Sequence, residues 1–461
     1  MGKNKGIIGF ILGIIVAIAI YFTNIQGLSN EGHLCLVFSL MTVIFWAFGI
    51  AQPGYTSGLY LLLLAVFKVA QPTLIFSTWT TSMMYLIIGA YLIATAVKES
   101  GLGERIAYWY ISKYVTNFKS IIISIFALTF ILSLLIPHPW PRAFLIMSVM
   151  AVVVKSANIP HEDAVKIGFT VFAASIPVSM IFLTGDASIN PLAAASCAPE
   201  AVGWLDWFKI MGLPMIITSL ITMFMIMYMF KPTKEVEVNK DEIARQRAEL
   251  GPMTGKEKRT AFWVVLAIIL WMTDTIHGVD IGWVTLFIAV MMAMPKVGGI
   301  LTPGSWNGVP VQTLLFLTAA VAIGRVGAAT GMNAWIAQTL LPSTIPENMF
   351  VLAAFITLVS IVVHLCFGSV IAVMGIVIPA MLAFTQSMGL STIIPVMIAY
   401  TAINAHFILP FHNLAMLVGT GEENGMYSEK ETIKFGVPFT LVLFIITCVV
   451  EIPWWKVIGL W

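Results

Sequence analysis

Apolar windows of the length needed to cross a bilayer follow one another along nearly the whole chain, and they constrain its fold more than any other feature. A membrane-spanning helix needs about 20 mostly apolar residues. We interpret the sequence as roughly eleven spans plus two interrupted segments, at residues 6–23, 34–50, 56–71, 82–97, 120–136, 165–184, 210–230, 261–276, 282–295, 311–328, 349–365, 391–409 and 435–452. Only 10% of the residues are charged, against about 25% in soluble domains. A water-soluble fold is therefore excluded, and we predict an all-α polytopic membrane protein.

The segment from Lys231 to Arg259 is the clearly soluble part of the chain and is dense in charges of both signs. Lysine and arginine accumulate on the cytoplasmic side of membrane proteins. We therefore place the loop 231–260 in the cytoplasm, together with the N-terminus, where Lys3 and Lys5 precede a first span that we expect to be retained. The C-terminus is expected outside, and the protein in the cytoplasmic membrane. The net charge of +2 gives no case for nucleic acid, and four scattered cysteines argue against a zinc site or a disulfide framework.

The stretch Leu132–Ala143 interrupts an apolar span with three prolines, a histidine and an arginine. Proline lacks a backbone N–H and disfavours helix in the residue before it, so no continuous helix can pass this stretch. Non-helical backbone at membrane depth is tolerated only where protein buries it or where it lines a wet cavity. A central arginine costs roughly 2.5–3.5 kcal/mol on insertion scales. We therefore predict a site at His138 and Arg142, in which Arg142 contacts an anion or a compensating carboxylate.

An internal repeat relates the two halves of the chain, because a shift of 230 residues superimposes Gly101 on Gly331 and the first broken stretch on Leu365–Val373. Weak self-similarity with matching broken segments is typical of secondary transporters built from inverted repeats, with the site between them. Chance similarity between two helices rich in alanine and glycine is the alternative. The expected elements are repeats at 1–230 and 261–461 and re-entrant hairpins near 121–158 and 349–388.

A second interruption follows each broken stretch, at Phe182–Pro191 in the first half and at Phe407–Asn413 in the second. Unwound backbone there offers carbonyl groups to Na+, and nearby helix N-termini favour an anion. Asp186 is the one carboxylate well inside the apolar part of the first half. It suits an ion ligand or a proton carrier, and a fixed salt bridge to Arg142 is the competing interpretation.

Other readings of these residues stay open. His364, His406 and His412 lie in or beside the interruptions of the second half, where they suit proton coupling or, alternatively, hydrogen bonding in the core. A titratable Asp186 would serve a cation/proton antiporter. An integral membrane enzyme using His138, Asp186 and His412 is a further alternative. The sequence contains no Walker A, HExxH or GxSxG motif, so we expect a gradient to drive transport.

The order of these landmarks resembles the divalent anion:sodium symporter family over nearly the whole chain. Phe45–Pro53 is similar to the family's W-x-T-E-A-I-P stretch, Gly89–Ala107 to its G-G-F-L-L-A-L-A segment, and Phe407–Pro410 to its F-M-L-P region. The resemblance implies a scaffold domain that dimerises and a transport domain that holds both hairpins and moves as an elevator.

The hairpins depart from the resembled family. Its members carry a Ser-Asn-Thr motif in each hairpin, whose side chains bind Na+ and the substrate carboxylate. These motifs fall here on Pro137-His138-Pro139 and on Ser369-Val370-Ile371, so only Ser369 is kept. The resemblance therefore implies the fold more firmly than a di- or tricarboxylate substrate.

We predict a secondary active transporter that moves a small anion, such as a carboxylate or sulfate, with Na+ favoured over H+ as the coupling ion. No cofactor is expected besides that ion, and the expected partners are the anion, the coupling cation, the lipid bilayer and a second copy in a homodimer. The residues expected to bind the substrate are Pro137, His138, Pro139, Trp140, Arg142, Gly368, Ser369, Val370, Ile371 and His412. The residues expected to serve the coupling ion are Ser133, Thr184, Gly185, Asp186, Asn190, Asn404 and Asn413.

Overall fold

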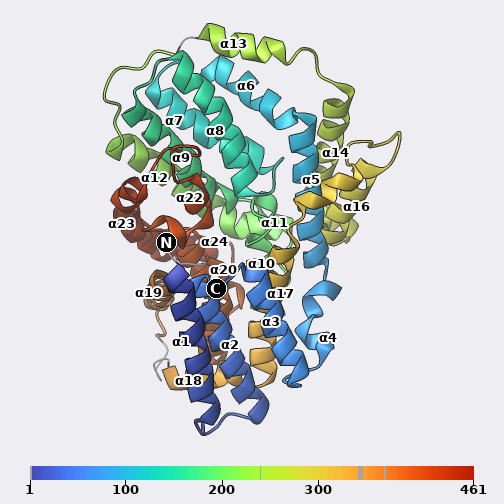
Figure 1. Ribbon diagram of the computed structural model, residues 1–461, viewed down its shortest axis with the longest axis vertical. Helices are drawn as coiled ribbons and strands as arrows, with labels where there is room; N and C mark the ends of the chain where they lie inside the picture. The colour runs from blue at the N-terminus through green and yellow to red at the C-terminus, as the bar shows by residue number, and fades with distance from the viewer. Residues whose placement is uncertain (1–2, 239, 341–345, 368–369) are drawn as a thin grey trace.

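The computed structural model describes residues 3–238, 240–340, 346–367 and 370–461, which form a bundle of helices with no strand among them (Figure 1). The first half runs through α1 Lys3–Phe22, α2 Asn30–Phe48, α3 Pro53–Val66, α4 Pro72–Ile75, η1 Ser77–Thr80, α5 Ser82–Ser100, α6 Leu102–Tyr114, α7 Phe118–Ser133, α8 Pro139–Ser156, α9 His161–Ser179, η2 Leu183–Gly185, α10 Asn190–Ser196, α11 Trp204–Trp207, η3 Phe208–Gly212 and α12 Leu213–Met229. The rest of the chain adds α13 Lys240–Glu249, α14 Gly255–Met272, α15 Asp274–His277, α16 Ile281–Ala293, η4 Pro303–Gly308, α17 Val311–Ala329, α18 Met332–Leu340, α19 Met349–Phe367, α20 Val370–Thr385, η5 Gln386–Met388, α21 Ile393–Asn404, η6 Pro410–His412, α22 Leu414–Gly419, α23 Glu429–Ile445, η7 Ile446–Glu451 and α24 Ile452–Val457.

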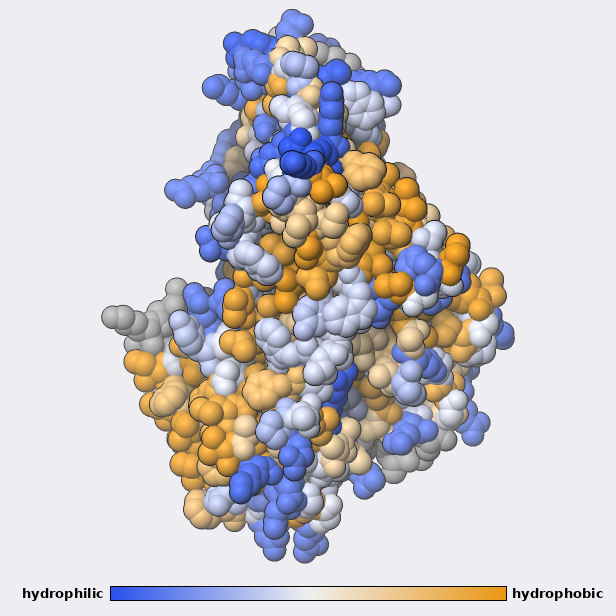
Figure 2. All heavy atoms as spheres, turned by 90° about the vertical axis from the view of Figure 1, so that its right-hand side faces the viewer, coloured by the Kyte–Doolittle hydropathy of each residue, from blue (hydrophilic) through white to orange (hydrophobic). Residues whose placement is uncertain are grey.

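Six helical stretches in the described part of the chain are long and apolar enough to cross a membrane, and they confirm the predicted class. They are Asn30–Phe48, Ser82–Ser100, Trp204–Met229, Val311–Ala329, Met349–Cys366 and Glu429–Val457. Shorter apolar helices such as α3, α7 and α20 accompany them. Large apolar side chains of α14 and α16, among them Phe262 and Phe287, are more than half exposed. On the face that includes these helices, apolar side chains cover the middle of the molecule and hydrophilic ones gather at its upper end, at the level of α13 (Figure 2).

The two halves of the chain repeat one order of elements. A glycine with a left-handed backbone separates two helices in each half: Gly101, with φ of 80°, joins α5 to α6, and Gly331, with φ of 78°, joins α17 to α18. Such a conformation is nearly free of strain for glycine alone. A broken helix pair follows in each half, α7 with α8 and α19 with α20, and then a helix that ends in unwound chain, α9 or α21.

The first break lies where the prolines predict it. α7 ends at Ser133 and α8 begins at Pro139. Pro139 and Pro141 both lie in the first turn of α8, where a missing backbone N–H costs no intrahelical hydrogen bond. The break therefore terminates one helix and starts the next, and only Leu134–His138 lie between the two helices.

Buried apolar side chains form two clusters. One is built mainly from α1, α2, α3, α17 and α18, and the larger one comprises most of the remaining helices. In the larger cluster, α5 and α16 lie very close together at Gly282. A Cβ atom added there would lie only 2.0 Å from the backbone oxygen of Ser82, so a side chain at this position would separate the helices. The division into scaffold and transport domains stays a prediction, as do the dimer and the number of spans.

The charged segment at 231–260 is more ordered than the sequence suggests. It contains the helix α13, which packs against α6, and it is tied to α6 by Arg105. The Arg105 guanidinium donates two hydrogen bonds to Glu257, at 2.6 and 3.1 Å, and further ones to the carbonyl oxygens of Leu250 and Gly251. Because the Glu257 side chain is only 4% exposed, this ion pair is largely shielded from solvent.

Replacing Arg105 with alanine is expected to lower the free energy of unfolding by about 1–3 kcal/mol, because a buried carboxylate loses its donors. Thermal unfolding of the purified protein in detergent measures this. Arg245→Ala is the matched control: its ion pair with Glu242 is exposed, and such pairs contribute little. If Arg105→Ala and Arg245→Ala lowered the free energy of unfolding equally, the stabilising role assigned to the shielded Arg105–Glu257 ion pair would be contradicted.

The same ion pair predicts a pH dependence. Burial raises the pKa of the Glu257 carboxyl, but the hydrogen bonds from Arg105 and Thr254 outweigh burial, so the pKa lies below its usual range. A lowered folded-state pKa stabilises the protein above the unfolded-state pKa, about 4.3. That contribution is lost as the pH falls through the folded-state value. The difference in melting temperature between Arg105→Ala and the parent should therefore shrink under acid.

Candidate functional site

A cavity of about 340 Å³ lies where the N-terminal ends of α8, α20 and α22 meet the unwound chain before α10. These four helices approach one another near the centre of the molecule (Figure 1). Sites of this kind, mostly apolar with a few convergent polar groups, are typical of small ligands. The polar or aromatic residues that line the cavity are Trp46, Tyr91, His138, Trp140, Ser179, Asp186, Ser188, Gln312, Thr313, Phe316, Asn404, Phe411, His412 and Asn413.

His138 caps the first turn of α8. Its backbone is extended, with φ of −153°, and its Nδ1 accepts a hydrogen bond of 3.3 Å from the backbone N–H of Trp140. An imidazole whose Nδ1 accepts must, when neutral, carry its proton on Nε2. The ring lies beside Tyr91 and Trp140, with centroids 5.1 and 4.7 Å away. His138 can therefore donate from Nε2 while its Nδ1 stabilises the helix start.

His412 repeats this arrangement in the second half. Its Nδ1 accepts hydrogen bonds of 3.1 Å from the backbone N–H groups of both Ile408 and Leu409. The neutral ring must again carry its proton on Nε2. His138 and His412 both line the same cavity. Each half of the chain thus contributes one imidazole to the cavity wall, and the ring of His412 also hydrogen-bonds to the backbone of Leu365.

Arg142 is fully buried and does not line the cavity. Its Nη1 donates to the carbonyl oxygens of Ile136 at 3.1 Å and Gly185 at 3.2 Å, so the side chain joins the hairpin tip to the second interruption. Nε and Nη2 have no partner among the described residues. The salt bridge to Asp186 that we considered is not formed within 4 Å in this part of the chain, although the two charges interact at longer range.

Asp186 is buried and lines the cavity. Its Oδ1 accepts hydrogen bonds from the backbone N–H groups of Ser188 at 2.9 Å and Ile189 at 3.3 Å, just before α10. In the part of the chain that the structure describes, Oδ2 has no hydrogen-bond donor. A carboxylate oxygen at a cavity wall can accept a ligand's donor or coordinate a cation.

Asn404 and Asn413 also line the cavity, and they are partly engaged with each other. Asn413 donates from Nδ2 to the carbonyl oxygen of Asn404 at 2.9 Å, and its Oδ1 caps α22 by accepting from Ala415 at 3.0 Å. Asn404 donates to the hydroxyl of Tyr400 at 3.3 Å. The two asparagines therefore tie the end of α21 to the start of α22 beside the cavity.

Several predicted site residues lie behind the cavity wall and do not line it. Asn190 donates to the carbonyl oxygens of Ser179 and Phe182, at 2.8 and 2.9 Å, and thereby stabilises the unwound chain. Thr184 accepts from the indole of Trp204 at 3.1 Å. The remaining members of this group are Ser133, Pro137, Arg142 and Gly185. The geometry does not favour the direct contact with substrate or ion that we predicted for these residues. None of their side chains lines the cavity, and most of their polar groups are hydrogen-bonded within the protein.

The second hairpin tip is only partly described. Val370 and Ile371, at the start of α20, line the cavity together with Pro139 from the first tip. The predicted substrate contacts at Gly368 and Ser369 lie outside the described residues.

The sequence analysis missed lining residues on helices that contain no break. Tyr91 of α5 bonds through its hydroxyl to that of Ser188 at 2.8 Å. Gln312 and Thr313 lie in the first turn of α17. A tyrosine within an apolar span and a polar pair at the start of another are weak signals, because such residues also occur at membrane interfaces.

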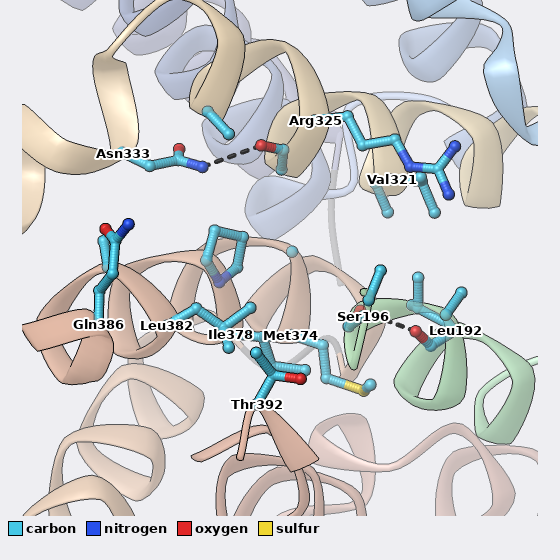
Figure 3. A pocket seen from close by; sticks show the side chains of 18 of the residues that line it. Leu192, Ser196, Val321, Arg325, Asn333, Met374, Ile378, Leu382, Gln386 and Thr392 are labelled. Atoms are coloured by element: carbon cyan, nitrogen blue, oxygen red, sulfur yellow. Dashed lines mark hydrogen bonds between the residues drawn. The ribbon is translucent and has the colours of Figure 1, made fainter. Parts of the chain in front are cut away.

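A second cavity, of about 640 Å³, lies between α10, α17, α18 and α20. Side chains of Val321, Arg325 and Asn333 face those of Gln386 and Leu192 across it (Figure 3). Among the described residues that line it, Arg325 is the one charged side chain, and its Nη1 donates to Ser77 at 2.9 Å.

The two cavities are lined by the same two helices, although no residue lines both. Along α17, Phe316 lines the first cavity and Ala320, one turn later, lines the second. α20 does the same with Ile371 and Met374. Neighbouring turns of the same two helices therefore line the two cavities.

Replacing Arg142 with lysine is expected to lower the melting temperature, because a single ammonium group cannot reproduce the guanidinium's span between two carbonyl groups. The loss should correspond to about 1–3 kcal/mol. Arg325→Lys, at a half-buried site, is the control and should change the melting temperature less. A melting temperature unchanged by Arg142→Lys would refute this role.

The chain is similar to known transporters over most of its length. The family model described as the sodium:sulfate symporter transmembrane region matches residues 4–461. Dicarboxylate transporter 1, chloroplastic, of Arabidopsis thaliana is 24% identical over 84% of this chain and 71% of that protein. Sodium-dependent dicarboxylate transporter SdcS of Staphylococcus saprophyticus is 21% identical over 90% of this chain and 86% of that protein.

A solved structure supports the fold. The crystal structure of the Alcanivorax borkumensis YdaH transporter matches with a TM-score of 0.56 and 14% identity, and the match covers 89% of this chain and 99% of that one. The family resemblance seen in the motifs is thus confirmed: the chain belongs to the sodium:sulfate symporter family, the divalent anion:sodium symporters.

Proposed function

We propose that this protein carries a small dianion, of the dicarboxylate or sulfate class, across the cell membrane together with Na+. The observation that carries the proposal is the meeting of two imidazoles, His138 and His412, in one cavity with the carboxylate of Asp186. The names of the relatives support the substrate class, and the family description supports Na+.

Two helix N-termini add to the attraction for an anion. The first residues of α8 and of α20 both line the cavity. The N-terminal end of a helix carries a partial positive charge, and its first N–H groups lack intrahelical partners. At α8 this partial charge acts without free N–H groups in the first turn, because Pro139 and Pro141 have none and that of Trp140 donates to His138. Helix starts from two directions, together with the two imidazoles, would attract an anion and leave no fixed full positive charge in direct contact.

The cation is assigned to Asp186. Its unbonded oxygen and the neighbouring amide of Asn404 supply the oxygen ligands that Na+ prefers. A cation at this carboxylate would reduce its repulsion of an incoming anion, which gives a physical reason for coupled binding. A small anion fits the volume of about 340 Å³.

The larger cavity is assigned to the path between the binding cavity and one side of the membrane. Adjacent turns of α17 and α20 line the two cavities, which supports this assignment, and Arg325 would attract an anion there. Movement of the hairpins as an elevator within a homodimer belongs to the same proposal and rests on the family resemblance.

A cation/proton antiporter is the second candidate, favoured by the carboxylate of Asp186 in the cavity. Donors from both halves argue against it, because they repel a cation. The family points to transport and gives no support to an enzyme.

Uptake into proteoliposomes tests the proposal. Radiolabelled succinate or sulfate should accumulate when a Na+ gradient is imposed, and substituting K+ should abolish accumulation. Asp186→Asn should weaken the dependence on Na+ more than binding of the anion. If the protein exchanges cations when no anion is present, and takes up neither succinate nor sulfate, the antiporter would be favoured instead.

His138→Ala and His412→Ala test the anion donors. Each removes one donor from the cavity, so the KM for the anion should rise about tenfold, as expected for a loss of about 1.4 kcal/mol. His161→Ala, an exposed histidine, is the control. An unchanged KM in both cavity variants would exclude these imidazoles from anion binding.

A further inference from the structure

A second carboxyl group is buried inside the bundle, and the proposed function does not use it. Glu451 ends the segment η7, where the last long helix changes to a π-helical turn. Its side chain is 0% exposed, and it lines neither cavity. π-helical turns inside longer helices are uncommon and often occur at functional sites.

Glu451 has one hydrogen-bond donor. The hydroxyl of Thr401, on α21, donates to Oε1 at 2.6 Å. Oε2 has no partner among the described residues. No ion pair involves Glu451 in this part of the chain.

The elements around Glu451 bring no charge to it. α21 contributes Tyr400 besides Thr401, and η7 itself contributes Cys448; both interact electrostatically with the carboxyl group. His364 of α19 is bonded instead to His406 and to the carbonyl oxygen of His412. The remaining titratable side chains on the packed elements lie elsewhere: Tyr228 of α12 and Cys366 of α19 are exposed, and Lys456 of α24 stacks on Trp461. Glu429, Lys430, Glu431 and Lys434 occupy the far end of α23.

A carboxylate in this setting is costly. Removing an ion from water costs several kcal/mol unless a counter-charge and hydrogen bonds replace the solvent. One hydroxyl donor does not do so. Ionisable residues inside membrane segments are rare and usually mark ion or proton pathways. The group lowers its energy most simply by carrying a proton on Oε2.

The end of α21 connects Glu451 with the substrate cavity. Thr401 is followed three residues later by Asn404, which lines the cavity. Tyr400, adjacent to Thr401, accepts from Asn404 and donates to Asn190 at 2.5 Å. A shift at the end of α21 when the cavity is filled would therefore reach the partner of the carboxyl group.

We propose that Glu451 is a proton-binding site of the transport cycle: Oε2 takes a proton from water in one state of the protein and returns it to water in another. Movement of the anion would then be linked to protons as well as to Na+. This inference rests on the proposed transport function.

Glu451→Gln is the test variant, because the amide resembles a carboxyl group that cannot release its proton. The purified full chain is reconstituted in proteoliposomes, and two quantities are measured with radiolabelled succinate and with sulfate: exchange at equal pH, and accumulation under an imposed pH gradient. If one proton moves per turnover, a gradient of one pH unit changes the accumulation ratio of the parent protein about tenfold. Glu451→Gln should keep exchange and lose this response. Glu429→Gln, an exposed position on the same long helix, should behave as the parent.

Infrared difference spectroscopy gives a readout that does not depend on transport. A carboxylic acid band that changes with pH, shifts in D2O and is absent from Glu451→Gln would support the site. Glu451→Asp serves if the glutamine variant does not fold, and its pH response should be displaced from that of the parent.

The contrary outcomes are distinct. A pH response that persists in Glu451→Gln, or exchange without any pH response in the parent, would overturn the proton site and leave the transport function standing. An acid band that never changes with pH would identify a permanently protonated structural group and would also overturn it. Absence of exchange for both probes would count against the transport function, and the infrared titration would still decide the protonation of Glu451.

Discussion

Breaking a helix inside a membrane frees backbone N–H and C=O groups that water cannot reach, and the structure depends on how these groups are bonded. At the first hairpin tip, Arg142 donates to the carbonyl oxygens of Ile136 and Gly185, and Ala187 donates to that of Pro137 at 3.0 Å. Unpaired groups of this kind cost several kcal/mol each in hydrocarbon. The polar side chains at the breaks therefore stabilise the unwound backbone, and several of them also face the cavity.

This requirement explains how the site combines the two halves. His138 and His412 each bond to backbone N–H groups through Nδ1, so the neutral rings carry their proton on Nε2. The nitrogen that stabilises the backbone is thus not the one that we propose for anion binding. The asparagines at the second interruption are shared in the same way, because Asn413 caps α22 and still lines the cavity.

Much of the fold could be predicted from the sequence, because membrane spans and helix breaks depend on local properties. The apolar windows, the prolines before α8 and the paired glycines Gly101 and Gly331 all act through the backbone of their own segment. The site was less predictable. Arg142 looks like a ligand group in the sequence, yet tertiary contacts direct it to carbonyl groups, and Tyr91 reaches the cavity only through the packing of α5. Such contacts depend on chain segments that are far apart in sequence.

The helices common to the two cavities have a consequence for selectivity. On α17 and α20 the residues that surround the small cavity are separated by one helical turn from those that surround the large one. A helix rotates and shifts as a rigid body, so any displacement that widens one space alters the other. The shapes of the two cavities are thus coupled through these helices, and under the proposed function a bulkier side chain at Ala320 or Met374 would change how fast an anion arrives and which anion fits at the same time.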